Sequence, residues 1–253
     1  MNDFLSPAEA LALLFALVLL AQLMLKAWLI SRQARAVARH RHAVPADFAQ
    51  TISLQAHQRA ADYTQAKLRL GLIELALGAA VLLGWTLLGG LEALNNAWLA
   101  ALGPHPLLQP LALLASFVLI NGLIDLPLSL YQSFVIEQRY GFNRLTWRLW
   151  LSDLLKSNAL GLAIGLPLGA LVLWLLQLAG PWWWLWTWAA WLGLSLLMLL
   201  IYPSWIAPLF NRFEPLQDEA LATRVQQLMA RCGFAAKGLF VMDGSRRSAH
   251  ANA

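Results

Sequence analysis

The histidines come first, because imidazole nitrogens bind metal ions and transfer protons near neutral pH. The chain has five: His40, His42, His57, His105 and His250. None lies in a His-Glu-x-x-His helix, and none shares a helical face suited to zinc with a His or carboxylate three or four residues away. The sequence also lacks a Gly-rich phosphate loop and a Gly-x-Ser-x-Gly elbow. Cys232 is its single cysteine, so no internal disulfide can form. By itself, the sequence therefore predicts no catalytic residue and no metal site.

Two carboxylates, Glu74 and Asp125, fall inside or near apolar segments. An ionisable group at membrane depth is a functional-site hypothesis by default. Both, however, lie near the cytoplasmic ends of predicted membrane spans. This position favours an interfacial placement, or pairing with Arg69 or another basic residue, over a proton relay.

Two polar segments carry more information. Residues 134–144 form a charged, aromatic loop in which Gly141 permits a tight turn and Glu137 can pair with an arginine. We interpret this loop as a structural clasp. Residues 242–253 are dense in small polar side chains just after a predicted strand, a composition suited to backbone contacts with a ligand.

Composition indicates that membrane helices position these residues. The chain is 60% hydrophobic and only 12% charged, with thirteen tryptophans, which excludes an ordinary soluble enzyme. A spanning helix needs about 20 apolar residues. The segments that satisfy this lie at about 8–30, 70–91, 107–128, 156–179 and 182–202. Gly103 to Pro106 break the chain before the third span, and Gly180-Pro181 form the hairpin between the last two.

The basic residues predict the orientation of these spans. Eight lie from Lys26 to Arg69, four from Arg139 to Lys156, and six from Arg212 to Arg247. The N-terminus, the second loop and the Trp-rich hairpin carry none. The positive-inside rule therefore places the N-terminus outside and the C-terminus in the cytoplasm. The same pattern accounts for the net charge of +5 without a nucleic-acid partner.

The residues after the fifth span change character. Asp218 is a predicted N-cap of an amphipathic helix that ends at Gly233, and residues 238–242 are predicted as a short buried strand. Pro203, Pro208 and Pro215, which precede this helix, predict an irregular segment. The predicted fold class is an all-α polytopic membrane protein, with five transmembrane helices in a domain over 1–203 and the start of an α/β cytoplasmic domain over 204–253.

Several segments occur in a recognisable order. They are residues 61–70, Leu126-Pro127, residues 134–137, residues 141–143, residues 206–213 with Pro215-Leu216, and residues 243–253, which include Ser248-Ala249-His250-Ala251-Asn252-Ala253. Together they resemble the type 1 CAAX prenyl proteases, integral-membrane zinc metalloproteases, in their bacterial form. The resemblance extends over most of the chain.

The resemblance implies a seven-span helical barrel around a water-filled chamber in the inner (plasma) membrane. In that family a His-Glu-x-x-His helix and a later glutamate bind zinc, and the motif glutamate activates water. These residues lie downstream of the motif in which this sequence stops. We therefore expect a truncated chain that binds no zinc itself. His250 matches a motif position that is not a zinc ligand, and Asn252 and Ala253 are the expected substrate contacts.

Three functions remain open. The leading hypothesis is the membrane part of a zinc endopeptidase whose partners are the lipid bilayer and a peptide or membrane-associated protein substrate. The second is a non-catalytic membrane scaffold or regulatory subunit. A small-solute transporter is weakest, since no pair of interrupted helices in matching halves is evident.

The predicted orientation can be tested by cysteine labelling in intact cells. In a chain with Cys232 replaced, we expect His105→Cys to react with an impermeant thiol reagent added outside. Arg144→Cys should stay protected until the membrane is opened. The reverse pattern would exclude the N-out arrangement of five spans.

Overall fold

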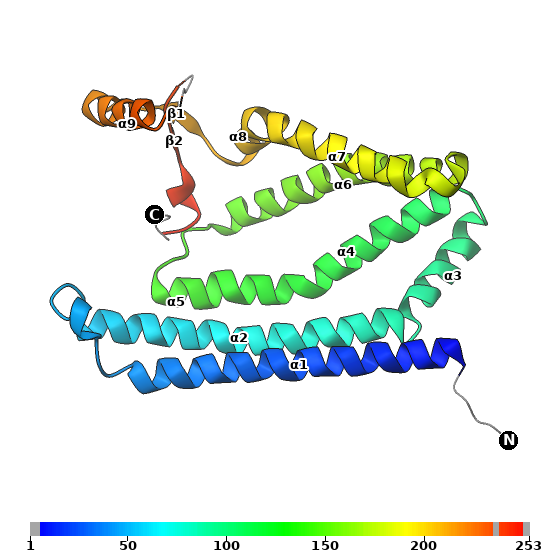
Figure 1. Cartoon of the computed structure of the whole chain (residues 1–253), viewed down its shortest axis with the longest axis horizontal. Helices are drawn as coiled ribbons and strands as arrows, with labels where there is room; N and C mark the ends of the chain where they lie inside the picture. The colour runs from blue at the N-terminus through cyan, green and yellow to red at the C-terminus, as the bar shows by residue number, and fades with distance from the viewer. Residues whose placement is uncertain (1–5, 235–237, 250–253) are drawn as a thin grey trace. The chain divides into compact units, whose positions relative to one another are not determined.

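The computed structural model of the chain describes residues 6–234 and 238–249. The chain divides into two compact units, Met1–Asn143 and Arg144–Ala253. The first unit contains α1 Pro7–His40, η1 Ala46–Phe48, α2 Leu54–Thr86, α3 Gly90–Leu102, α4 Leu108–Tyr131, η2 Gln132–Glu137 and α5 Gln138–Tyr140 (Figure 1). The second contains α6 Trp147–Leu178, η3 Gly180–Trp182, α7 Trp183–Ile201, η4 Tyr202–Ile206, α8 Ala207–Phe210, β1 Phe213–Pro215, α9 Glu219–Arg231, β2 Phe240–Met242 and η5 Gly244–Arg246.

Within residues 6–234 and 238–249, five helical segments are long and apolar enough to cross a membrane, which agrees with the predicted number of spans. They are Pro7–His40, Leu54–Thr86, Leu108–Tyr140, Trp147–Leu178 and Gly180–Phe210. Most of their large apolar side chains are exposed. Helices with such surfaces suit a lipid environment, because each helix satisfies its own backbone hydrogen bonds and lipid covers the apolar side chains.

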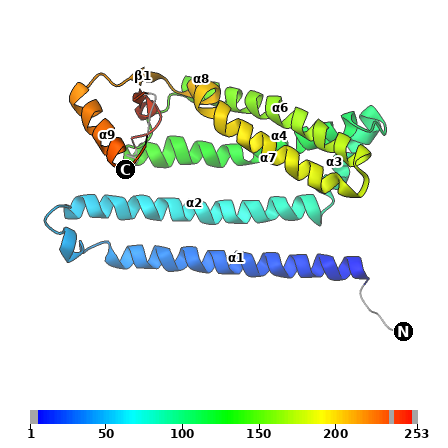
Figure 2. The same ribbon diagram turned by 45° about the horizontal axis from the view of Figure 1, so that its top comes forward.

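The helices α1 and α2 lie side by side as an antiparallel hairpin (Figure 2). A capping box starts α1: the Ser6 hydroxyl accepts from the Glu9 backbone N–H at 3.3 Å, and the Glu9 carboxylate accepts from the Ser6 N–H at 2.8 Å. Ser53 caps α2 by accepting from the Ala56 N–H at 3.2 Å. Both helix starts are therefore fixed by local side chains.

Hydrogen bonds join α1 and α2 near the loop that connects them. The Arg41 guanidinium donates to both carboxylate oxygens of Asp62, at 2.7 and 2.8 Å. Gln65 reaches across to the carbonyl oxygen of Ala34 at 2.5 Å. The Asp62 carboxylate raises the pKa of the Arg41 guanidinium. Arg41 therefore stays charged over the whole physiological pH range.

The second apolar helix differs from its predicted bounds of 70–91. It begins at Leu54, so a polar extension precedes the apolar part, and it ends at Thr86. Gly89 then adopts φ +77°, and Gly90 starts α3. A Cβ atom on Gly90 would meet the Gly84 carbonyl oxygen at 2.6 Å. This close backbone approach makes the turn, and it lies within an apolar stretch where hydropathy gives no boundary.

Side-chain hydrogen bonds join α3 and the end of α2 to α4. The Trp98 indole N–H donates to Ser116 at 2.8 Å, and the Trp85 indole N–H donates to the Asn121 side chain at 3.2 Å. The predicted break before the third span is confirmed, because Gly103 takes φ +66° and α4 starts at Leu108. The first unit therefore combines apolar helices with a few polar links between them.

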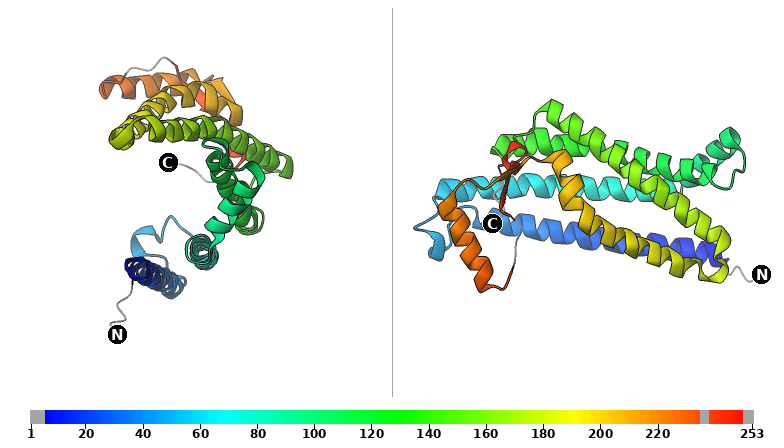
Figure 3. Two further views of the ribbon diagram at one scale, coloured as in Figure 1. Left: turned by 90° about the vertical axis from the view of Figure 1, so that its right-hand side faces the viewer. Right: turned by 90° about the horizontal axis from the view of Figure 1, so that it is seen from above.

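In the second unit, α6 and α7 pack as a hairpin (Figure 3). The Thr146 hydroxyl caps α6 by accepting from the Leu149 N–H at 3.2 Å. The turn between the helices uses Gly180 at φ +51°, as the Gly-Pro pair predicted. The tryptophans after this turn are exposed, a position typical of an aromatic belt at a membrane interface: Trp182, Trp183, Trp184, Trp186 and Trp188.

The last described elements are one helix and a small sheet. Asp218 caps α9 through the Leu221 N–H at 2.9 Å, and Gly233 follows its end at φ +71°, both as predicted. The strand β2 pairs antiparallel with β1, with Glu214 opposite Val241. The prediction of a buried strand was wrong, because all three residues of β2 are exposed. The irregular segment predicted before α9 contains the partner strand β1.

Gly90 provides a test of this fold. We expect Gly90→Ala to lower the free energy of unfolding by about 1–3 kcal/mol, because its Cβ would overlap a backbone carbonyl that cannot rotate away. Gly78→Ala, inside α2 with open space around its Cβ, is the matched control and should be neutral or slightly stabilising. The measurement is denaturant titration of the detergent-solubilised protein. Equal effects of the two changes would contradict the close approach.

Candidate functional site

Arg247 lies at the centre of a polar cluster in the second unit. Its Nε and Nη2 atoms donate to the two carboxylate oxygens of Asp153 on α6, at 2.7 and 3.1 Å. Nη1 donates to the Asn211 side-chain oxygen at 2.7 Å, and Nη2 also donates to the Phe210 carbonyl oxygen. The backbone carbonyl of Arg247 accepts from the Arg144 N–H at 3.2 Å. We call this set of contacts the Arg247 cluster.

The cluster closes the end of the fifth apolar helix. The last carbonyl groups of a helix have no partner within it and carry partial negative charge. Here the Lys156 ammonium donates to the Leu209 carbonyl oxygen at 2.9 Å, beside the bond from Arg247 to Phe210. Asp153 supplies the opposite charge, and it raises the pKa of Arg247 through its hydrogen bonds. Two cations therefore satisfy the carbonyl groups of this helix end, and Asp153 balances the charge of Arg247.

A tight turn brings Arg247 into the cluster. The Asp243 carboxylate accepts from the Arg212 backbone N–H at 2.8 Å and from the Arg246 side chain at 3.0 Å. The Asp243 N–H in turn donates to the Arg212 carbonyl oxygen at 3.2 Å. The bond from the Arg212 backbone, together with Arg246, lowers the pKa of Asp243. The charged carboxylate therefore extends the β1–β2 pairing by one step and directs the chain toward α6.

A second polar cluster lies in the first unit. The Tyr63 hydroxyl on α2 donates to the Glu137 carboxylate at 2.6 Å. The Tyr63 ring also contacts Tyr140 at 5.3 Å and Phe142 at 4.9 Å between centroids. Lys67 lies 5.5 Å from the centre of the same ring. The sequence had suggested an arginine for Glu137, and Tyr63 is a partner that the sequence did not reveal.

Backbone contacts give this loop the form of the predicted clasp. Gly141 takes φ +83°, which favours glycine, and the Phe142 N–H returns to the Glu137 carbonyl oxygen at 2.8 Å. Arg59 donates to the Tyr140 carbonyl oxygen at 3.2 Å. Two hydrogen bonds therefore join the loop to α2. The Glu137 carboxylate accepts from Tyr63, and the Tyr140 carbonyl oxygen accepts from Arg59.

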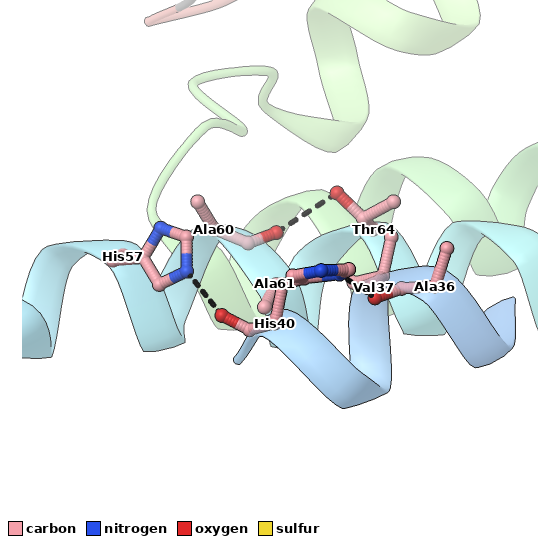
Figure 4. Close-up of a pocket in the computed structure, with 7 residues that line it drawn as sticks. All are labelled: Ala36, Val37, His40, His57, Ala60, Ala61 and Thr64. Atoms are coloured by element: carbon pink, nitrogen blue, oxygen red, sulfur yellow. Dashed lines mark hydrogen bonds between the residues drawn. The ribbon is translucent and has the colours of Figure 1, made fainter. Parts of the chain in front are cut away.

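A pocket of about 400 Å³ lies between α1 and α2 near their loop (Figure 4). Small side chains create it: Ala36, Ala60, Ala61 and Thr64 line it with Val37, His40 and His57. His57 donates to the His40 carbonyl oxygen at 2.8 Å, and His40 donates to Ala36 at 2.8 Å. One nitrogen of each imidazole is thus used within the hairpin, and the pocket walls are mostly apolar.

The structure tests only part of the sequence-based site. The predicted substrate contacts Asn252 and Ala253, and the motif residue His250, lie outside the described residues. Glu74 and Asp125 are exposed and, within the described chain, have no hydrogen bond or ion pair. The suggested pairing of Glu74 with Arg69 is therefore not found. No group of three or more His, Cys, Asp or Glu able to hold a metal ion occurs in residues 6–234 and 238–249.

Sequence reasoning missed Asp153. This residue carried one usable signal, because it is the only carboxylate between Glu137 and Glu214. A single acid in the first turns of an apolar helix requires a cation, and Arg247 lies 94 residues away. The distance along the chain hid the pair.

The clasp in the first unit gives a direct prediction. Tyr63→Phe removes the bond to Glu137 and keeps the ring contacts, so we expect a loss of about 1.5 kcal/mol or more in the free energy of unfolding. Tyr131→Phe is the control, because Tyr131 is exposed and its hydroxyl has no partner in the described part of the chain. Denaturant titration in detergent measures both. A Tyr63→Phe loss no larger than that of the control would show that the hydroxyl bond contributes nothing.

Comparisons with known proteins place this arrangement in a family. Residues 33–212 match the family model described as CAAX prenyl protease N-terminal, five membrane helices. The chain is 40% identical over 163 residues to CAAX prenyl protease 1 homolog of Arabidopsis thaliana, which covers 63% of this chain and 38% of that protein. It is 34% identical over 155 residues to the Homo sapiens homolog, covering 61% of this chain and 33% of that protein.

A solved structure shows the same similarity. The crystal structure of S. mikatae Ste24p matches with a TM-score of 0.85 and 29% identity, over 92% of this chain and 56% of that chain. This chain spans less than two fifths of the plant and human relatives. Because the family model covers more than half of the sequence and all five apolar helices fall wholly or partly within it, the chain belongs to the CAAX prenyl protease family.

Proposed function

We propose that this chain is the N-terminal membrane domain of a zinc metalloendopeptidase that cleaves peptides at the cytoplasmic face of the inner membrane. The family match to the five-membrane-helix domain is the observation that carries the proposal. The one-sided distribution of basic residues supports an outside N-terminus and a cytoplasmic C-terminus.

The contacts beyond the matched domain add support. The family match ends at Arg212, and the chain then forms β1, α9 and β2 before Arg247 returns to Asn211 and Asp153. A second domain that acts on substrates at a membrane surface has to be attached firmly to the helices that define that surface. We propose that the small sheet and the Arg247 cluster attach a downstream domain in this way.

The described residues do not fit a zinc site, since they hold no suitable group of ligands. We therefore assign no chemical step to them. The proposal is that zinc ligands and the general base come from sequence outside these 253 residues. Asn252 is proposed to hydrogen-bond an extended substrate, with Ala253 kept small for clearance.

A non-catalytic membrane scaffold is the alternative function. It would keep the helices, the clasp and the Arg247 cluster, because each of these contributes to the fold without any substrate. The two hypotheses predict different coding sequences downstream of residue 253. They also predict different peptidase activities for the full-length product.

The test compares the 253-residue chain with the full-length product of its gene, both purified in detergent. We expect the full-length protein to contain one zinc ion and to cleave a prenylated CAAX peptide, with loss of activity on chelation and recovery with added zinc. The 253-residue chain should bind no stoichiometric zinc and cleave nothing. The unprenylated peptide serves as a second substrate, which shows whether the lipid is needed.

Three results would overturn parts of the proposal. A full-length protein without zinc or peptidase activity would favour the scaffold. One-to-one zinc in the 253-residue chain, removed by His250→Ala, would show that this histidine is a ligand after all. Labelling that places the C-terminus outside would exclude cleavage at the cytoplasmic face.

A further inference from the structure

One face of α1 carries a row of basic side chains just after the apolar part of the helix. The row starts beside Trp28 and contains Arg32, Arg35 and Arg39, at intervals of four, three and four residues. Residues with these spacings lie on the same side of a helix. All four side chains are exposed, whereas α2 packs against another side of α1, where Val37 is half-buried (Figure 2). We call the three arginines the α1 arginine row.

The α1 arginine row has no anionic partner within residues 6–234 and 238–249. None of its three guanidinium groups makes a hydrogen bond or an ion pair there. Arg41, by contrast, lies toward α2 and is paired with Asp62. The sequence has no carboxylate between Glu9 and Asp47. The row is therefore a patch of positive charge that the described part of the chain does not neutralise.

Trp28 marks the point where the row meets the membrane. Its side chain is 52% exposed, and the guanidinium carbon of Arg32 lies 5.6 Å from the centroid of its ring. A cation at this range is attracted to the ring face, and tryptophan prefers the boundary between hydrocarbon and headgroups. On the N-terminal side of Trp28, the same face of α1 presents the exposed side chains of Leu17 and Met24. The row therefore continues a surface that suits lipid acyl chains.

The length of the helix places the row at the depth of lipid headgroups. A helix rises about 1.5 Å per residue, so Arg32 and Arg35 lie about 6 and 10 Å beyond Trp28 along the axis. The headgroup region of one leaflet is about 5–8 Å thick. Side chains in a helix also lean toward its N-terminus, which here is the direction of the apolar segment. Both guanidinium groups therefore reach the phosphate layer, whichever way α1 crosses the membrane.

We propose that the α1 arginine row binds the headgroup phosphate of an anionic phospholipid, whose acyl chains lie along the exposed apolar face of α1. Guanidinium groups donate strong, charge-assisted hydrogen bonds to phosphate oxygens. An anionic lipid fits better than a zwitterionic one, because a zwitterionic headgroup carries its own cation. A lipid fits better than free phosphate, because free phosphate leaves the adjoining apolar face unused. This binding does not depend on peptidase activity.

The topology of the chain does not by itself explain the row. The positive-inside rule accounts for the side of the membrane on which these arginines lie. It does not require them to share one helix face with Trp28 and with the apolar side chains before it. A lipid that contacts the apolar face and the arginines together does require this alignment.

The test measures lipid binding by the full-length protein in detergent, using native mass spectrometry. Phosphatidylglycerol and phosphatidylcholine are titrated separately, and each gives an apparent Kd. The test variant is Arg32→Gln/Arg35→Gln. The matched control is Arg224→Gln/Arg231→Gln, which removes two exposed arginines from α9. Melting temperature and the cysteine-labelling pattern are recorded for every variant, so that misfolding or an inverted orientation is not mistaken for lost binding.

We expect the parent to bind phosphatidylglycerol about tenfold or more tightly than phosphatidylcholine, with weaker binding at high salt. Arg32→Gln/Arg35→Gln should raise the Kd for phosphatidylglycerol about tenfold or more, because two cations beside the phosphate are lost. The Kd for phosphatidylcholine should change little. Arg32→Lys/Arg35→Lys should restore most of the affinity because it keeps both charges. The α9 control should remain close to the parent.

Three results would overturn the proposal. The first is equal affinity of the parent for the two lipids. The second is a loss in Arg32→Gln/Arg35→Gln no larger than that in the α9 control. The third is displacement of the lipid by inorganic phosphate, which would make a soluble anion the ligand. If the double variant fails to fold, Arg35→Gln alone provides the test, with an expected loss of about threefold.

Discussion

A helix in lipid satisfies its own backbone along its length but leaves unpaired groups at both ends, where no partner exists within the helix. The structure depends on how these ends are closed. Side chains of Ser6, Ser53 and Thr146 accept from the first N–H groups of three of the apolar helices. The end of the fifth is closed by Lys156 and Arg247 on its last carbonyls. Polar residues are scarce in this chain, and several of them lie at these helix ends.

In the described part of the chain, two π-helical segments, η2 and η4, lie where an apolar helix leads into polar contacts. One precedes the clasp and ends at Glu137, and the other precedes Phe210 and Asn211. Since each residue of a helix turns by about 100°, the wider turn shifts the face that later side chains present. The rest of the helix can then face lipid while its last residues face a partner.

Local signals made much of this structure predictable. Long apolar runs indicated the five helices, Gly103 and Gly180 indicated the turns, and Asp218 indicated the start of α9. The end of α2 was mispredicted, because Gly89 and Gly90 break a segment that remains apolar on both sides. Non-local pairings were missed for a different reason: neither the β1–β2 pairing nor the Asp153–Arg247 pair leaves a periodic pattern in the sequence. The candidate site depends mainly on such pairs.

The separations of these pairs along the chain imply an order of assembly during synthesis. Arg41 and Asp62 are 21 residues apart, whereas Asp153 and Arg247 are 94 apart. Loop closure costs more entropy as the intervening chain lengthens, and a ribosome releases the nearer partner first. The α1–α2 hairpin can therefore close while most of the chain is still unmade. The Arg247 contacts form only after all five apolar helices have been synthesised, so they are among the last contacts of the described residues to form.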